Sequence, residues 1–120
     1  MNTSQDYLNG QFEKVQASSG EWVGISPADL SDHVGKVMYS YDSVDKAVEG
    51  ARASYKGWRK LSIAERSHYL RKFQDVVRAN IDPWALIISR EVGKPTWEAK
   101  GEVQTVLNKV DITLGEGLRA

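Results

Sequence analysis

Two histidines are the residues of this sequence best suited to acid–base or metal chemistry. His33 follows Asp29 and Asp32 in a polar segment, and clusters of aspartate and histidine can bind metal ions. We expect no metal site there, because the sequence offers no second histidine at helical or hairpin spacing. His68 falls on the polar side of a predicted helix, and neither histidine can be assigned to an acid–base pair.

Paired carboxylates are the other candidates. Glu98 and Glu102 are one turn apart on one face of a predicted helix. A catalytic pair would need an enclosing pocket, so a hydrated helix surface is the simpler interpretation. The sequence has no G-x-G-x-x-G loop, Walker loop or nucleophile elbow, and Gly93-Lys94-Pro95 is predicted to end a helix.

Composition excludes several classes of protein. The chain has no cysteine, which excludes disulfides, thiolate metal sites and a cysteine nucleophile. Its 120 residues suit one domain, and its 16 basic and 16 acidic residues disfavour nucleic-acid binding, although residues 42–80 are mildly basic. No apolar run is long enough for a transmembrane helix, and residues 1–6 lack the features of a secretory signal. We therefore expect a cytoplasmic protein with no membrane or nucleic-acid partner.

Four tryptophans could form a surface that stacks sugars or bases: Trp22, Trp58, Trp84 and Trp97. Three of them fall at the ends or in the first turns of predicted helices, where tryptophan more often seals a core. We therefore predict core positions for them.

The first forty residues have the character of short strands. Asn9-Gly10 between short apolar pairs predicts a two-residue hairpin over residues 7–12. Residues 21–26, which precede Pro27, and residues 36–41, which follow Gly35, are also predicted as strands. Together they form too little sheet to be stable alone.

Helical periodicity begins at Ser43. The first helix has the apolar stripe Val44, Ala47, Val48, Ala51, Tyr55 and Trp58, with Asp42 or Ser43 as the expected cap and Gly57 at its end. Ser62-Ile63-Ala64-Glu65 matches a capping box and predicts a second helix. Its stripe is Ile63, Leu70, Phe73, Val77 and Ile81.

Two more helices are predicted toward the C-terminus. Asp82-Pro83 indicates a new start, with Asp82 as the N-cap, and Gly93 indicates the end of that helix. Thr96 is expected to cap the last helix, whose stripe is Ala99, Val103, Val106, Leu107, Val110 and Leu114. Periodicity and composition thus predict a mainly helical segment with a short β start and no complete catalytic site.

Several stretches in this order resemble the N-terminal segment of aldehyde dehydrogenases. Residues 7–10 resemble the opening strand, residues 43–58 the first long helix and residues 61–66 the start of the second. Residues 88–95 resemble a segment with glutamate, glycine, lysine and proline. Trp97-Glu98-Ala99, Glu102-Val103 and Asn108-Lys109 are most similar to the succinylglutamate semialdehyde dehydrogenase branch.

The resemblance implies an α/β family fold, of which residues 1–120 are a single incomplete domain. Residues 1–41 would supply short strands and loops, and residues 42–120 a helical segment of the cofactor-binding domain. The full-length enzyme would use NAD or NADP to oxidise N-succinylglutamate 5-semialdehyde to N-succinylglutamate in arginine catabolism. An alternative is a stand-alone helical interaction module without enzyme activity.

The family's catalytic cysteine, general-base glutamate, oxyanion asparagine and glycine-rich NAD loop all correspond to positions beyond Ala120. We therefore assign no catalytic, cofactor-binding or metal residue here, and we expect the chain alone to be inactive and to bind no cofactor. Glu102 is the nearest counterpart of a carboxylate that binds a structural cation in some members. We expect Trp84, Ile87, Leu107 and Val110 to lie on exposed helix faces that contact the rest of the dehydrogenase chain or a second copy.

Overall fold

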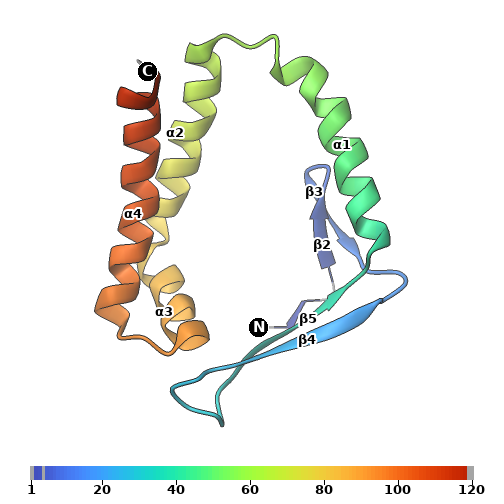
Figure 1. The fold of residues 1–120 in the computed structure, drawn as a ribbon, viewed down its shortest axis with the longest axis vertical. Coiled ribbons are helices and arrows are strands. Elements are labelled where there is room, and N and C mark those ends of the chain that lie inside the picture. Colours follow the sequence, from blue (N-terminus) through green and yellow to red (C-terminus); the bar gives the residue numbers. More distant parts are fainter. Residues whose placement is uncertain (1, 4, 119–120) are drawn as a thin grey trace. The chain divides into compact units, whose positions relative to one another are not determined.

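The computed structural model describes residues 2–3 and 5–118, which belong to two compact units (Figure 1). The first unit comprises Met1–Ile25 and Ser31–Lys60, and the second comprises Ser26–Leu30 and Leu61–Ala120. The predicted lack of a secretory signal concerns residues 1–6, of which residues 1 and 4 lie outside the described residues.

The strands of the first unit form two small sheets. They are β1 (Asn2–Thr3), β2 (Gln5–Leu8), β3 (Gln11–Lys14), β4 (Gly20–Ile25) and β5 (His33–Tyr39). In one sheet, β5 lies between β1, to which it is parallel, and β4, to which it is antiparallel. In the other sheet, β2 and β3 form an antiparallel hairpin. A strand is therefore found in each of the three predicted segments, but β5 runs over His33–Tyr39, whereas residues 36–41 were predicted.

The β2–β3 turn has the backbone that its sequence predicts. Asn9 and Gly10 have φ angles of 52° and 85°, the left-handed values that a type I′ hairpin requires at both positions. The register places Tyr7 opposite Phe12, and their rings meet edge to face with centroids 5.0 Å apart. The hairpin therefore depends on a local turn and one aromatic pair.

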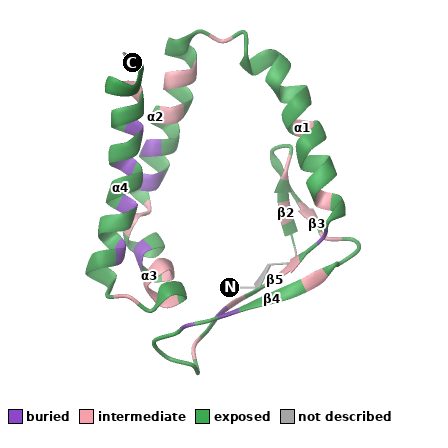
Figure 2. Cartoon of the chain, viewed as in Figure 1, coloured by how far each residue is buried: buried purple, intermediate pink, exposed green. Residues whose placement is uncertain are grey.

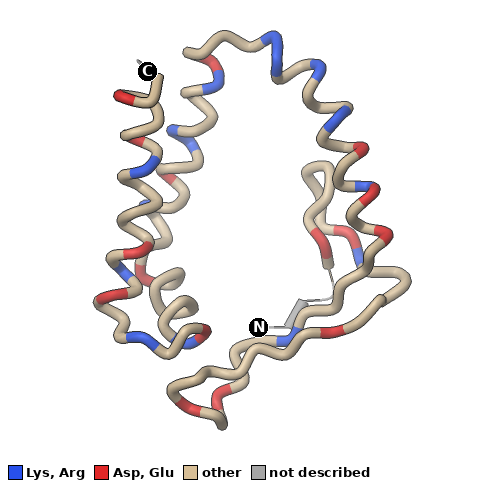
Figure 3. The backbone as a smooth tube through the Cα atoms, in the orientation of Figure 1, with Lys and Arg blue, Asp and Glu red and all other residues tan. Residues whose placement is uncertain are grey.

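Helix α1 (Asp42–Trp58) completes the first unit and contains no buried residue (Figure 2). Its predicted apolar stripe is present in the sequence but exposed in this chain. Acidic Asp42, Asp45 and Glu49 lie in its first half, whereas its last turns carry basic residues (Figure 3). Acidic residues near the start of a helix and basic residues near its end interact favourably with the helix dipole. This charge pattern therefore stabilises α1, which buries no side chain.

One close approach ties α1 to the β2–β3 hairpin. A methyl group on Gly50 would collide with the side chain of Asn9. The hydroxyl of Ser43, near the start of α1, donates a hydrogen bond to the carboxylate of Asp6 on β2. A side chain at position 50 would therefore force the Asn9 amide to move.

The second unit consists of helices packed around one core. They are α2 (Ile63–Ala79), α3 (Ile81–Val92), α4 (Thr96–Leu114) and the short 3₁₀ helix η1 (Glu116–Leu118). Helices α2 and α4 run antiparallel side by side, and α3 packs against α4 (Figure 1). The core cluster is Val77, Ala85, Ala99, Val103 and Leu107, with Ile81 and Ile88 packed against it. Among the described residues, no helix combines the length and apolar character that crossing a membrane requires.

The start of α2 confirms the predicted capping box. The backbone N–H of Glu65 donates to the Ser62 hydroxyl at 3.2 Å, and the Ser62 N–H donates to the Glu65 carboxylate at 2.8 Å. The Glu65 carboxylate accepts hydrogen bonds from the backbone N–H and from the hydroxyl of Ser62, and both favour its charged form, so the pKa of Glu65 is lowered.

The predicted starts of the other helices are wrong by one or two residues. Tyr41 is the N-cap of α1 and makes no side-chain cap bond, so neither Asp42 nor Ser43 serves that role. Helix α3 begins at Ile81 with Asn80 as its N-cap, because α2 and α3 share Asn80 as a junction. Helix α4 begins at Thr96 itself, with Pro95 as the N-cap.

Several burial predictions are also wrong. All four tryptophans are exposed, Trp97 most of all at 76%. Conversely, Leu107 and Val110, predicted to lie on a face open to partners, are buried inside the second unit. Of that predicted face, Trp84 is exposed and Ile87 is partly buried. The helix pair α2–α4 buries Leu107 and Val110, which the sequence stripe alone could not show.

Candidate functional site

The connection between α3 and α4 is the most tightly specified turn of the second unit. Gly93 ends α3 with a φ of 70°, as predicted for a helix C-terminus. A Cβ at Gly93 would lie 2.8 Å from Cγ of Pro27 and 3.1 Å from the backbone nitrogen of Ala28. The Ser89 hydroxyl donates to the Lys94 carbonyl oxygen at 2.6 Å. Two backbone segments therefore meet where no side chain fits.

Lys94 joins this turn to the first half of α4. Its ammonium donates to Glu98 at 3.1 Å and also to Glu102. The hydrogen bonds that Lys94 donates to Glu102, which has the larger effect, and to Glu98 raise the pKa of Lys94. The structure thus brings together the predicted carboxylate pair, but around an ammonium group.

This pairing bears on the cation candidate. Glu102 faces Lys94, and among residues 2–3 and 5–118 no group of three or more His, Cys, Asp or Glu side chains could hold a metal ion. A cation at Glu102 stays a prediction from the family resemblance. In the structure, the ion pairs of Lys94 with Glu98 and Glu102 link the α3–α4 turn to the first half of α4. We call these two ion pairs the Lys94 clamp.

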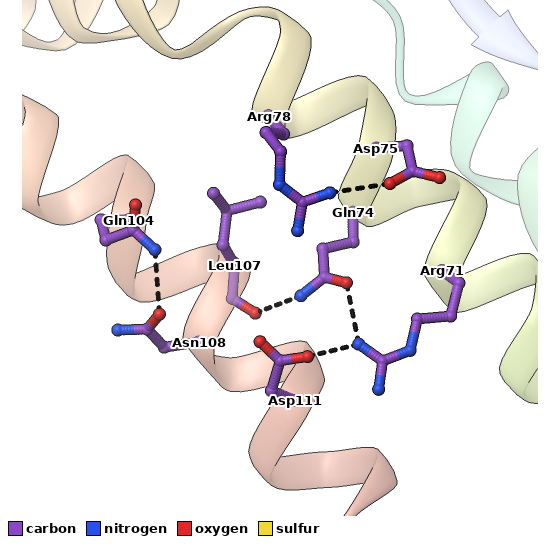
Figure 4. A network of polar contacts seen from close by, with 8 residues as sticks. All are labelled: Arg71, Gln74, Asp75, Arg78, Gln104, Leu107, Asn108 and Asp111. Atoms are coloured by element: carbon purple, nitrogen blue, oxygen red, sulfur yellow. Dashed lines mark hydrogen bonds and ion pairs between the residues drawn. The ribbon is translucent and has the colours of Figure 1, made fainter.

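A second polar network links α2 to α4 (Figure 4). Gln74 is buried, donates to the Leu107 carbonyl oxygen at 2.9 Å and accepts from Arg71 at 2.9 Å. Arg71 also pairs with Asp111, and this bond, with help from Gln74, lowers the pKa of that carboxyl. The sequence gives no sign that Gln74 is buried, because a glutamine in a helix is usually exposed.

The three shifted groups have a common property. The pKa values of Glu65 and Asp111 fall and that of Lys94 rises, so each group is held more firmly in its charged form at neutral pH. A general acid or base needs a pKa near the working pH, which these shifts move away from. The shifts are those expected of ion pairs and hydrogen bonds that position helices.

The two histidines lie in different units of the chain. His33 begins β5 and pairs with Ile25 of β4, and His68 lies on α2 with its ring 6.2 Å from that of Tyr69. Both are exposed. Each histidine therefore lies at the surface of its unit.

Each unit has a hollow on its surface. A small one of about 100 Å³ lies between the β2–β3 hairpin and the start of α1, and Asp6, Ser43 and Lys46 are among its lining residues. A wider groove of about 370 Å³ lies between α2 and α4. It is lined by Leu70, Phe73, Thr105, Val106, Lys109, Val110 and Thr113. The first is polar and too small for a dinucleotide, and the second is an open, apolar surface.

The glycines at the end of α4 do not supply a nucleotide loop. Gly115 and Gly117 have the one-residue spacing of a phosphate-binding turn. They follow a helix and lead into η1, however, whereas the dinucleotide fingerprint follows a strand and opens a helix. The described residues therefore do not fit a dinucleotide phosphate at this point.

Comparison with known proteins identifies related sequences along nearly the whole chain. Residues 15–120 match the aldehyde dehydrogenase family. An α-ketoglutaric semialdehyde dehydrogenase from Bacillus subtilis is 38% identical over 120 residues, covering 98% of this chain and 24% of that protein. An N-succinylglutamate 5-semialdehyde dehydrogenase from Sphingopyxis alaskensis is 45% identical over 71 residues, covering 59% of this chain and 15% of that protein. The chain thus spans about a quarter, or less, of these relatives.

Solved structures agree with the sequence matches. The crystal structure of an NAD-dependent aldehyde dehydrogenase from Sinorhizobium meliloti superimposes with a TM-score of 0.83 and 32% identity. The match covers 97% of this chain and 23% of that one. An aldehyde dehydrogenase structure from Bartonella henselae gives a TM-score of 0.88 at 21% identity, over 95% of this chain and 24% of that one, and supports the fold alone.

Proposed function

This chain belongs to the aldehyde dehydrogenase family, and we propose that it is the N-terminal part of an NAD(P)-dependent oxidoreductase. The observation that carries the proposal is the family match over residues 15–120, together with a related structure that matches 97% of the chain. The same structure is described as NAD-dependent, which supports this cofactor class for a full-length enzyme. We propose a cytoplasmic location for it.

The proposed substrate is N-succinylglutamate 5-semialdehyde, oxidised to N-succinylglutamate in arginine catabolism. Relatives named for this substrate include the Sphingopyxis enzyme and one from Vibrio cholerae that is 32% identical over 107 residues. In the balanced reaction the aldehyde carbon loses a hydride to NAD⁺ and gains an oxygen from water. The products are a carboxylate, NADH and two protons.

α-Ketoglutaric semialdehyde is a second candidate substrate. The relative named for it matches 98% of this chain, whereas the Sphingopyxis enzyme matches 59%. Both candidates carry an aldehyde and at least one carboxylate, so the proposed reaction class is the same. Competition between the two substrates therefore tests the finer proposal without affecting the coarser one.

We further propose that the 120-residue chain is inactive alone. The resemblance implies a thiolate nucleophile that attacks the aldehyde, and this chain has no cysteine to supply one. The proposed contribution of this segment is structural: its Gly93 turn, Lys94 clamp and Gln74 link hold α2, α3 and α4 in a fixed arrangement.

The first test is the mass of the native protein in an extract of its source, followed with antibodies against residues 63–94. A species about four times heavier than 13.4 kDa supports the dehydrogenase proposal, since the chain covers 24% of a full relative. That species should produce NADH with N-succinylglutamate 5-semialdehyde at a higher kcat/KM than with α-ketoglutaric semialdehyde. A higher kcat/KM with α-ketoglutaric semialdehyde would instead make that aldehyde the proposed substrate.

The alternative is a stand-alone helical interaction module without enzyme activity. The exposed apolar side chains on α1 favour it, because a helix with no buried residue has a face available to a partner. A native species of 13.4 kDa would support this alternative and would overturn the dehydrogenase proposal.

A further inference from the structure

The segment Ser26–Leu30 belongs to the second unit, although it connects β4 to β5 of the first. Ser26 is buried, with 3% of its surface exposed. The backbone N–H of Asp29 donates to the Ser26 carbonyl oxygen at 3.3 Å, and Pro27 follows Ser26 in the turn that this bond closes. The bond and the fixed φ of proline both restrict the turn. The segment therefore has little conformational freedom to lose when it packs against another surface.

The α3–α4 turn has a notch at Gly93, and this segment lies in it. A Cβ at Gly93 would stand 2.8 Å from Cγ of Pro27 and 3.1 Å from the backbone nitrogen of Ala28. The notch therefore exists only because residue 93 has no side chain. The Ser89 hydroxyl donates to the Lys94 carbonyl oxygen, and the Lys94 clamp holds the same residue to α4. Segment and notch are thus each ordered by bonds of their own.

We propose that the notch at Gly93 is an intramolecular docking site for the segment Ser26–Leu30, strong enough to hold residues 1–60 to residues 61–120 when the chain between α1 and α2 is cut. Because β4 and β5 flank the segment, a fragment of residues 1–60 carries it as part of one continuous chain. The notch lies wholly within the other fragment, in the turn between α3 and α4. The inference uses contacts inside the second unit alone and does not depend on the proposed dehydrogenase activity.

Cleavage of the folded chain tests the proposal. A recognition sequence for a specific protease is inserted between Lys60 and Leu61, in the connection that joins α1 to α2. After cleavage, we expect residues 61–120 to stay bound to a tagged fragment of residues 1–60 on an affinity column. Gly93→Ala should raise the dissociation constant of the two fragments at least about tenfold, because its methyl group occupies the notch. The matched control is Gly101→Ala, where the same methyl group meets open space.

A second pair of variants changes the segment and leaves the notch intact. Pro27→Ala removes the Cγ atom that faces Gly93 and loosens the turn, so it should also raise the dissociation constant. Leu30→Ala removes a side chain that is 78% exposed and should leave it unchanged. This pair decides the question if circular dichroism shows that Gly93→Ala does not fold. Fragments that separate in the parent chain would overturn the proposal, as would binding that Pro27→Ala and Leu30→Ala affect equally.

Discussion

Gln74 on α2 donates from Nε2 to the main-chain carbonyl oxygen of Leu107 on α4 at 2.9 Å, in a buried setting. The bond joins two residues that are 33 positions apart in the chain. Its partner is a backbone group, so no substitution at Leu107 removes the acceptor. The alignment of α2 with α4 therefore depends strongly on the identity of residue 74.

Gln74→Leu tests this dependence. The substitution removes the bond that Gln74 donates to the Leu107 carbonyl oxygen, which keeps its bond within α4, and the bond that Gln74 accepts from Arg71. We expect a loss of about 1 kcal/mol of unfolding free energy. Urea unfolding followed by circular dichroism measures the change. The matched control is Gln104→Leu, which removes an exposed bond of 2.9 Å to Asn108 and should change stability by less than about 0.5 kcal/mol. Equal losses in the two variants would contradict the role assigned to Gln74.

Val77→Ala tests the core between α2 and its neighbours. Val77 is fully buried, and removing two methyl groups there should cost about 2 kcal/mol from lost burial and the remaining cavity. Val76 is its neighbour in sequence but is exposed, so Val76→Ala should change the unfolding free energy by less than about 0.5 kcal/mol. Thermal unfolding of the pair compares identical chemical changes at adjacent positions. A similar effect of both would show that α2 is rotated relative to the structure.

Gly93→Ala and Gly101→Ala should change stability in opposite directions. At Gly93 the φ of 70° and the contact with Pro27 both oppose a Cβ, and we expect a loss of about 1–3 kcal/mol. Gly101 lies inside α4 with open space around it, where alanine is the better helix former by about 0.5–1 kcal/mol. The midpoints of urea unfolding report both signs. A stabilising Gly93→Ala would mean that the α3–α4 turn is not constrained as described.

Acid should weaken the second unit through the α2 capping box. The pKa of Glu65 is lowered in the folded chain, so its contribution to stability is present above its unfolded pKa and disappears as the pH falls through the folded value. Asp111, whose pKa is also lowered, acts in the same direction. Glu65→Gln keeps the side-chain shape and should flatten the loss of stability below about pH 4.5.

The measurement for this prediction is the urea midpoint between neutral and acidic pH. Glu91→Gln makes the same charge change outside a capping box and serves as the control. An acid dependence that is equally steep in the parent chain and in Glu65→Gln would contradict the prediction. The pH dependence from the Lys94 clamp has the opposite sign. Because the pKa of Lys94 is raised in the folded chain, its contribution to stability is lost as the pH rises through the folded value.

Local signals were the part of the fold that sequence could predict. Asn9-Gly10, the capping box at Ser62 and the terminal Gly93 each act through backbone geometry within a few residues, and all three are confirmed. The helix start that Asp82-Pro83 predicts is wrong by two residues, because it also depends on the backbone that precedes it. The backbone continues almost directly from α2 into α3 through Asn80, so the start lies at Ile81 and Pro83 falls within the first turn.

Burial was less predictable, because it depends on which helices meet. Periodicity identifies an apolar stripe but not the surface that covers it. Ala99, Val103, Leu107 and Val110 of the α4 stripe are buried in the second unit, although Val106 of the same stripe is exposed. The stripe of α1, by contrast, contains no buried residue. The candidate site shows the same limit: the Glu98 and Glu102 pair was visible in the sequence, but its occupation by Lys94 required the turn at Gly93.

The lack of buried side chains in α1 has a consequence in time as well as in space. A seventeen-residue helix held chiefly by its own hydrogen bonds and charge pattern opens at little free-energy cost. Amide protons in α1 should then exchange with solvent much sooner than those around Val77 and Val103, which open only when the helical core does. Amide exchange in this chain is thus expected on two timescales. The slower exchange belongs to the helices that Gln74 and Lys94 hold together.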